Sequence, residues 1–508
     1  MRKFLLTLVS IVSLGVIVGC GGGSSNTTPV PSGPTGGNNV GFTTASLKGT
    51  YVFAANGINS SNSLAVVGTF TADGTGNIAT GSRDTINDTR GQVLGESISG
   101  SYKVNQDGRG QMTLTGSSGQ SIYPFVLSSP SAGKLFQDSA SVDAVGRFEL
   151  QPSAVPALSS GTSTYVIRLM GEDPSQNPYA AVGGLTVTAG TTLTGTIDEN
   201  DSGTFNQQLP ATGTLTLTSA TGTMSYTTTN SSTQTTHDFA VFYVSPSRLE
   251  LISTDASWFL YGYADLQTTV SASTSAFTGN QVLNLSGFDV LGPLEETGRL
   301  YLDGAGNVSN AIKDYNEDGT LYQDVGLNGT YSITGASTPG RWTASLTANS
   351  GAIVNENLVG WQVSPQQSLV LADYGANPSI SNYSLLETGD MRTQTIGLSN
   401  GNVKGNYAQF FEGYDFGGVG NFESTGNYLA DGNGNLSGTI DFQTDTQGFT
   451  QNRSQSSTYA VDNIFGRGTA TVSGVPVIFY TVDDSTIYMI SSDAAAAYQG
   501  TLTLQTAP

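Results

Sequence analysis

Apolar and polar residues alternate over short runs along most of this chain, and glycine-rich turns separate the runs. Alternation at period two over four to eight residues predicts β-strands, and glycine after Asp or Asn, as in Asp73-Gly74-Thr75-Gly76, supplies the positive φ that hairpin turns need. No helical pattern lies between the runs. The first 155 residues predict about eight strands, at residues 51–56, 64–71, 77–83, 97–104, 111–115, 122–127, 134–137 and 147–151.

The same pattern returns three more times. An aspartate that follows the turn by about ten residues recurs as Asp84, Asp198, Asp314 and Asp441, at intervals of 114, 116 and 127 residues. Two further landmarks keep this register, an apolar run that ends in glycine upstream and a Gly/Ser-Ser/Thr-Tyr/Leu triplet downstream. They end at Gly57, Gly171, Gly287 and Gly413, and at Tyr102, Leu215, Tyr331 and Tyr459. Three landmarks in one register predict four tandem β units, at residues 46–155, 160–270, 277–396 and 402–508.

Short loops predict that neighbouring strands are antiparallel. A meander of eight strands exposes two sheet edges unless its last strand pairs with its first, so each unit is predicted to close into a small eight-stranded barrel. A two-sheet sandwich is the alternative. The pattern resembles the meander barrels of the avidin and lipocalin type, which implies the same fold, although no binding residue of those families can be placed in this sequence.

The N-terminus has the marks of a secretory signal: a basic head, Met1-Arg2-Lys3, an apolar run over residues 4–18 and small residues before a break. Ile17-Val18-Gly19-Cys20 resembles the lipobox of bacterial lipoproteins. That resemblance implies a signal peptide over residues 1–19, a diacylglyceryl group on the sulfur of Cys20, and membrane attachment through the acyl chains. An ordinary signal peptide with an incidental cysteine is the alternative.

Cys20 is the only cysteine, so no disulfide can form within the chain. Gly21 is not the aspartate that resembles an inner-membrane retention signal, which favours an outer-membrane lipoprotein facing the periplasm or the cell surface. Residues 20–45 are rich in Gly, Ser, Asn, Thr and Pro, a composition that predicts a flexible tether.

The charge balance excludes one class of partner. The chain has 39 acidic and 18 basic residues and a net charge of −21. Such a surface repels phosphate backbones, so nucleic acid is not expected as a partner. The membrane, through the lipid, and an unidentified extracellular ligand or surface protein remain as expected partners.

The clearest candidate for metal chemistry is Asp314-Tyr315-Asn316-Glu317-Asp318-Gly319, which matches the first six positions of a calcium loop. Asp314, Asn316 and Asp318 would be the ligands. The twelfth position should be a glutamate but is Val325, and no helix is predicted on either side. The alternative is an acidic turn between the third and fourth strands of unit 3. No other cofactor is expected.

His237, the only histidine, lies at the edge of an apolar run. It could be the base of a Ser-His-Asp triad, but no Gly-x-Ser-x-Gly motif accompanies it. It is therefore expected to be a surface residue at a strand end. Trp258, Trp342, Trp361 and tyrosines such as Tyr261 and Tyr263 could stack on a ligand, but aromatic residues in strands more often pack in a core.

What the four units share is glycine, aspartate, aromatic and apolar residues at turn and strand positions, which is a folding signature rather than a set of reactive groups. The sequence therefore predicts a non-catalytic lipoprotein with a structural, adhesive or surface-display role. One alternative is a small apolar molecule or a glycan bound in or at the mouth of a barrel. A second is an enzyme of unknown class, because paired carboxylates are a spatial arrangement that spacing does not reveal.

Overall fold

The computed structural model describes residues 39–507, apart from 60–61, 140–141, 155–160, 289–291, 335–337, 374–385 and 396. Within these residues nearly all regular structure is β-strand. The helical elements are single 3-10 turns, η2 (Thr44–Ser46), η3 (Thr274–Ala276) and η4 (Asn400–Asn402). The all-β prediction is confirmed. In the described part of the chain, no helix is long and apolar enough to cross a membrane.

The strands form four successive meanders, which we call modules 1 to 4. Module 1 contains β1 (Lys48–Asn59), β2 (Asn62–Asp73), β3 (Asn77–Asn87), β4 (Gln92–Val104), β5 (Arg109–Gly116), β6 (Gly119–Ser129), β7 (Ala132–Phe136) and β8 (Val142–Leu150). Module 2 contains β9 (Thr162–Glu172), β10 (Pro178–Thr188), β11 (Thr192–Asp201), β12 (Thr204–Leu217), β13 (Thr221–Asn230), β14 (Thr233–Ser245), β15 (Arg248–Ser253) and β16 (Phe259–Leu266).

Module 3 contains β17 (Gly279–Phe288), β18 (Pro293–Leu302), β19 (Asn307–Glu317), β20 (Thr320–Ile333), β21 (Arg341–Ala348), β22 (Asn355–Ser364), β23 (Gln367–Asp373) and β24 (Leu386–Thr393). Module 4 contains β25 (Lys404–Asp415), β26 (Gly420–Asp431), β27 (Asn435–Thr444), β28 (Thr450–Thr458), β29 (Ala460–Val461), β30 (Arg467–Val472), β31 (Val475–Thr481), β32 (Thr486–Ser491) and β33 (Ala496–Leu504).

Modules 1, 2 and 3 are closed antiparallel barrels of eight strands, in each of which the first strand pairs with both the second and the last. The barrel prediction is therefore confirmed for these three, and the sandwich alternative is wrong. Module 4 differs, because it is a nine-stranded sheet with β28 at one end and β29 at the other. Its β30 has only six residues and pairs with the two-residue β29 but not with β28, so the ladder is not completed.

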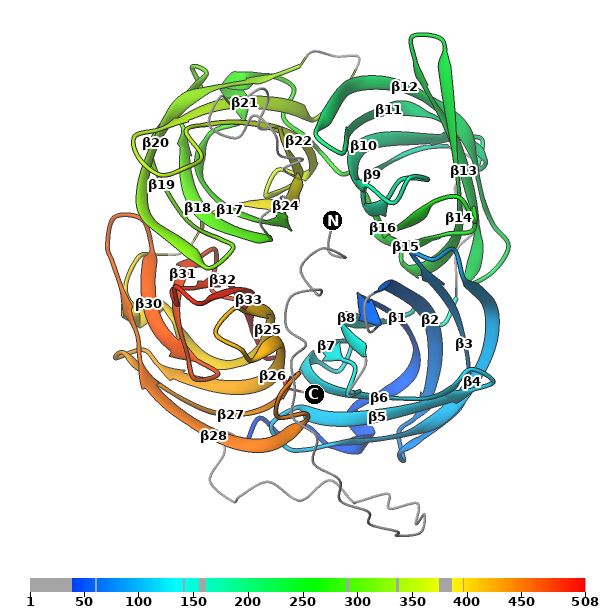
Figure 1. The fold of residues 1–508 in the computed structure, drawn as a ribbon, viewed down its shortest axis with the longest axis vertical. Coiled ribbons are helices and arrows are strands. Elements are labelled where there is room, and N and C mark those ends of the chain that lie inside the picture. The colour runs from blue at the N-terminus through cyan, green and yellow to red at the C-terminus, as the bar shows by residue number, and fades with distance from the viewer. Residues whose placement is uncertain are drawn as a thin grey trace, which may run out of the picture.

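The four modules lie in a ring around a common centre (Figure 1). Strands from the beginning of each module pack against strands from the end of the next module, and the start of module 4 packs against the end of module 1. An apolar cluster marks each of these four junctions. The buried members are Val52, Ala65, Val67, Ile86, Phe242, Val244, Ile252 and Phe259 (modules 1 and 2); Val166, Ala180, Val182, Trp361, Val363, Leu369, Leu371 and Leu386 (2 and 3); Val282, Ile478, Tyr480, Val482, Tyr488 and Ile490 (3 and 4); and Phe136, Val145 and Phe410 (4 and 1).

The ring explains why the apolar runs differ along each unit. In β1, Tyr51 and Phe53 enter the core of module 1, whereas Val52 between them faces module 2. A strand that is buried on both faces reads as a continuous apolar run. On the outer side of the ring, β13 has one buried face only, and its inward residues Met224 and Tyr226 alternate with polar ones.

The repeated Asp-Gly-x-Gly-Asn turn and the tyrosine downstream form one structural device. Asp73 accepts hydrogen bonds from the side chains of Thr75 (2.6 Å) and Asn77 (2.9 Å) and from their backbone N–H groups (2.6 and 3.1 Å), and these bonds lower its pKa. Tyr102 Oη accepts from the N–H of Gly74 (2.8 Å) and donates to the carbonyl of Leu47 (2.6 Å), which ends the 3-10 turn. Tyr331 and Tyr459 make the equivalent bonds in modules 3 and 4.

The predicted N-terminal boundary at residue 46 falls slightly too late. Phe42 is fully buried in the core of module 1, and the N–H groups of Val40, Gly41 and Phe42 all approach the carbonyl of Gln106. The predicted signal peptide, Cys20 and the first part of the predicted tether lie outside the described residues.

Candidate functional site: the polar junctions between the modules

The repeated aspartates are strand residues and not turn residues. Each lies on the third strand of its module opposite a β-bulge, where two residues of the fourth strand face this one residue and the pairing shifts. Each carboxylate accepts the backbone N–H of a residue with positive φ on that fourth strand. The four pairs are Asp84 with Gly95, Asp198 with Gln208, Asp314 with Asp324, and Asp441 with Asn452.

Three of these aspartates also bind an arginine from the next module around the ring. The arginine is the first residue of the fifth strand in modules 1 and 3 and of β30 in module 4, and it directly follows a glycine with positive φ. The pairs are Arg341–Asp198, Arg467–Asp314 and Arg109–Asp441, at 2.7, 2.7 and 2.6 Å. We call these pairs the arginine latches.

The latch between modules 2 and 3 is the most enclosed. The side chains of Arg341 and Asp198 are 1% and 0% exposed. Trp361 Nε1 donates to the same carboxylate (2.8 Å), and its ring crosses Gly184, where an added Cβ would lie 2.5 Å from the indole. Because two charges out of water are stable only when they are fully paired and hydrogen-bonded, each latch fixes one relative position of two modules.

A glutamine forms a second tie at every junction. In each module it directly follows the last strand, and its Nε2 donates to a backbone carbonyl of the next module. The bonds run from Gln151 to Tyr243, from Gln267 to Gln362 (2.7 Å), from Gln394 to Thr481 (2.7 Å) and from Gln505 to Leu127 (2.7 Å). The last of these joins the C-terminal strand to module 1 and closes the ring.

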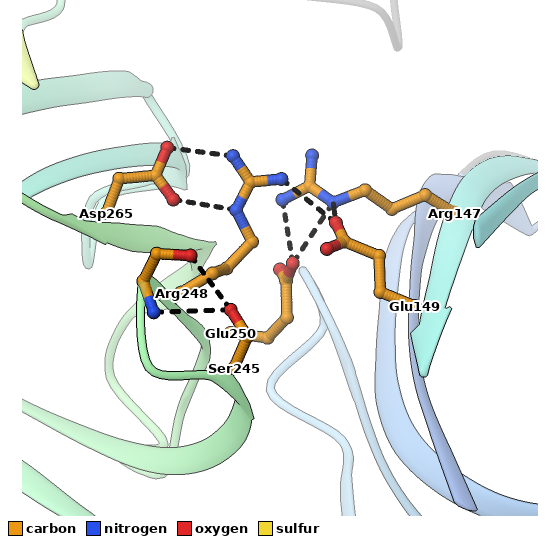
Figure 2. Close-up of polar contacts among 7 residues, drawn as sticks. Arg147, Glu149, Ser245, Arg248, Glu250 and Asp265 are labelled. Atoms are coloured by element: carbon orange, nitrogen blue, oxygen red, sulfur yellow. Dashed lines mark hydrogen bonds and ion pairs between the residues drawn. The ribbon is translucent and has the colours of Figure 1, made fainter. Parts of the chain in front are cut away.

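The junction between modules 1 and 2 has no arginine latch. Thr221 stands where the other modules have the arginine, and burial raises the pKa of Asp84, which has no cation beside it. A network on the centre-facing strands β8, β15 and β16 takes its place (Figure 2). Arg147 Nη2 lies 2.7 Å from Glu250 Oε1, and Arg248 binds both oxygens of Asp265 at 2.7 Å.

Glu149 connects the two halves of this network, because it accepts from Arg248 Nη1 at 3.0 Å and lies 3.8 Å from Arg147 Nε. The guanidinium groups of Arg147 and Arg248 also lie 4.6 and 4.8 Å from the centroid of the Tyr263 ring. Attraction between the cations and the ring allows two arginines to share this site. Tyr263 is thus held between arginines, and its face is not open for stacking on a ligand.

The junction between modules 4 and 1 carries a second small group at the ring centre. Lys134 Nζ lies 5.3 Å from the centroid of Phe410, and no carboxylate among the described residues lies within ion-pair distance of it. Burial, together with the charge of Arg147, lowers the pKa of Lys134 to about 8. Burial raises the pKa of Glu412 to about 7, against the pull of Lys134.

Module 3 encloses a group of charges inside its barrel. Lys313 Nζ, fully buried, lies 2.5 Å from Glu296 Oε2 and 2.7 Å from Glu356 Oε2. Burial and the neighbouring Glu356 raise the pKa of Glu296 to about 8, and burial raises that of Glu387 further. One lysine cannot neutralise three buried carboxylates, so at neutral pH this group keeps protons. Elsewhere in module 3 the core is apolar.

The prediction for His237 is wrong. The side chain is 1% exposed and points into the barrel of module 2 from the middle of β14, because it shares the inward face with Phe239 and Val241. Its ring contacts Trp258 (4.6 Å between centroids) and Tyr226 (5.2 Å). Neither ring nitrogen has a hydrogen-bond partner among the described residues, and burial lowers the pKa of His237 to about 4.

The candidate calcium ligands lie at the junction between modules 3 and 4. Asp314 binds Arg467 through both oxygens and accepts from Tyr480 Oη at 2.6 Å. Asn316 donates through Nδ2 to the carbonyl of Ala496 (2.7 Å). Both residues belong to β19, so the acidic-turn alternative is wrong for them. Calcium binding itself stays a prediction, and among the described residues no group of three His, Cys, Asp or Glu side chains is placed to hold a metal.

One cavity lies inside module 4 and another on the outer face of module 3. The core of module 4 holds an apolar void of about 10 Å³ beside Tyr459. A polar groove of about 550 Å³ runs over the outer face of β20, β21 and β22 and is bounded by Gln207 of module 2. Trp342, one of the aromatic candidates, is buried in the core of module 3.

The sequence carries signals of the junctions. Gly108-Arg109, Gly340-Arg341 and Gly466-Arg467 recur in one register, and a glutamine follows the last strand of every unit. Charged pairs separated by 143, 153 and 332 residues cannot be assigned without knowing that the modules form a ring.

No protein-family model and no curated protein matches this chain. Among solved structures, transferrin-binding protein B from serogroup B Neisseria meningitidis is similar over 73% of this chain and 82% of that chain, at 10% identity and a TM-score of 0.19. The protein of that name from Haemophilus parasuis Hp5 covers the same shares at 12% identity and a TM-score of 0.17, and CghA covers 94% and 96% at 7% and 0.15. Scores this low carry no argument about fold or function, so the class of this protein rests on its own geometry: a ring of β-meander modules joined by buried polar ties.

Proposed function

We propose that this protein is a lipid-anchored extracytoplasmic lipoprotein of the bacterial outer membrane, with a non-catalytic structural, adhesive or display role. The observation that carries the proposal is that the repeated polar residues form bonds within the protein. The aspartate and the glutamine present in all four modules, and the arginine present in three, are bonded to backbone or to each other. Duplication thus preserved groups that hold the ring and not groups that face a substrate.

The second support is the packing of the modules. The void of about 10 Å³ in module 4 is near the size of one water molecule. A barrel of eight strands has room only for its own side chains or for one small ligand, and clusters of buried apolar side chains line the interiors of modules 1, 2 and 3. We therefore expect a partner to meet the outer surface of the ring, since hydrogen bonds between the modules close each junction.

The anchor can be tested in cells. Cys20→Ser should move the protein from the membrane fraction to the soluble fraction, whereas the matched variant Ser24→Ala should stay with the membrane. Labelling with a radioactive fatty acid should follow the same pattern, and protease added to intact cells should degrade the wild-type protein if it faces outward. Retention of Cys20→Ser in the membrane would contradict the proposal.

A second candidate function is glycan binding, favoured by the groove of about 550 Å³ between Gln207 and the outer face of module 3. Hydroxyl and amide side chains line it, among them Ser345 and Asn357, and such groups pair with sugar hydroxyls. A glycan array with the wild-type protein and with Asn357→Ala tests this. Equal binding by both, or none by either, would dismiss the groove as a sugar site.

A further inference from the structure

The four junctions bury apolar clusters of different size, and the one between modules 4 and 1 buries the smallest. Among the described residues, eight buried apolar side chains join modules 1 and 2, eight join modules 2 and 3, and six join modules 3 and 4. Only Phe136, Val145 and Phe410 join modules 4 and 1. Since apolar burial is the main favourable term in association, this junction has the least of it.

The same junction is the one that no direct chain connection spans. Modules 1, 2 and 3 each continue into the next, whereas modules 4 and 1 meet as opposite ends of the sequence. Polar ties hold them: the Arg109–Asp441 latch, the Gln505 bonds to the carbonyls of Leu127 and Asp107, and the bond from Thr506 N–H to the Ser128 carbonyl (2.8 Å). Arg109 also donates to Asn452 (2.9 Å).

The junction between modules 1 and 2 is the one without a buried latch. At the equivalent position Asp84 has Gly95 as its hydrogen-bond donor but no arginine. The arginines that form ion pairs at this junction, Arg147 and Arg248, have side chains that are 25% and 21% exposed. Ion pairs with this exposure are weakened by salt, unlike the enclosed latch between modules 2 and 3.

Module 1 is therefore bounded by a junction with no chain connection on one side and by a salt-sensitive junction on the other. We propose that the face of module 1 that binds module 4 is an interaction surface for a second copy of this chain. Module 1 of one molecule docks on module 4 of another, and the two molecules exchange their first modules reciprocally.

The same physical contacts serve the closed ring and the exchanged dimer. An interface between unlike surfaces closes into a ring within one chain or continues between chains, depending on geometry. At low protein concentration the closed ring within one chain is favoured over the dimer, because the connection through modules 2 and 3 keeps module 1 close to module 4. High protein concentration, and salt that loosens the network of Figure 2, favour exchange.

The test uses two chains that each carry one cysteine at the junction. In a Cys20→Ser background, Ser128→Cys is placed in one chain and Thr506→Cys in another, since the backbone atoms of these residues are hydrogen-bonded. The two proteins are mixed at high concentration in about 1 M NaCl, a salt concentration that screens exposed charges, returned to low salt and oxidised. Peptide mapping by mass spectrometry then detects any disulfide between positions 128 and 506, and light scattering gives the mass. A chain with both substitutions is the positive control.

We expect the double variant to form its disulfide within one chain and the mixture to form it between two chains, as a dimer. Arg109→Met should speed the exchange by about 100-fold or more, because it breaks a buried ion pair at the junction that must open. Arg341→Met, which breaks the latch between modules 2 and 3, should leave the exchange rate unchanged. A mixture that never gives the link while the double variant does would overturn the proposal, and so would a double variant that forms no disulfide.

Discussion

The latches allow a prediction with an internal control, because Asp198 has an arginine partner and Asp84 does not. Asp198 accepts from Arg341 Nη2 (2.7 Å) and Nε (2.9 Å), as well as from the N–H of Gln208 (2.9 Å). Asp198→Asn leaves the guanidinium of Arg341, 1% exposed, without a counter-charge. Removing one member of a buried ion pair costs about 3–5 kcal/mol.

Asp84→Asn should lower the stability of the junction much less than Asp198→Asn does. Its carboxylate accepts a hydrogen bond from the backbone N–H of Gly95, and an asparagine oxygen can still accept that bond. The loss is therefore no more than about 1 kcal/mol, the value of one ordinary hydrogen bond. Because 1.4 kcal/mol is tenfold in an equilibrium constant, opening of the third strand should rise more than about 100-fold in the first variant and about fivefold in the second.

Hydrogen exchange with mass spectrometry measures this opening strand by strand. Peptides that cover β11 are compared in Asp198→Asn, and peptides that cover β3 in Asp84→Asn. Restoring neutrality with Arg341→Gln in the Asp198→Asn background should recover part of the protection. Equal losses of protection at the two positions would refute the argument that the arginine decides the strength of the tie.

Three further predictions concern charge. The pKa of Glu296 is raised to about 8, so folding stability should fall as pH rises from about 4.5 to 8. In thermal melts at several pH values, Glu296→Gln should make this fall smaller. An unchanged dependence of stability on pH would contradict the assignment. The pKa of His237 is lowered to about 4, so folding stability should fall by up to roughly 3 kcal/mol as pH drops from 6.5 to 4. His237→Phe should remove this loss of stability. If the loss persists in the variant, another group causes it. Because Asp314 is committed to Arg467 and Tyr480, removal of calcium with a chelator should leave the melting temperature unchanged, and a drop on chelation would revive the calcium site.

Most of the fold could be predicted from local sequence patterns, because neighbouring residues decide where turns and strands form. The Asp73 turn and the position of Tyr102 repeat in register since one residue caps the turn and the other binds it. Module 2 has Leu215 in place of the tyrosine and lacks the full Asp-Gly-x-Gly-Asn turn, so the two parts of the device are missing together.

The junctions could not be read in the same way, because their partners come from different modules. Asp314 looked like a turn residue or a calcium ligand, since its partner Arg467 is 153 residues away in the chain. His237 was expected at the surface because it lies at the edge of an apolar run, but in β14 it alternates in phase with Phe239 and Val241 and so faces the core. Which face of a strand meets a neighbour depends on closure of the barrel and of the ring.

The central claim is that four modules form one closed ring. Electron microscopy of single molecules of the soluble Cys20→Ser protein tests it most directly. The account predicts class averages with four lobes in contact around a centre, including contact between the first and the last lobe. Averages that show a string of separate lobes with free ends would contradict it.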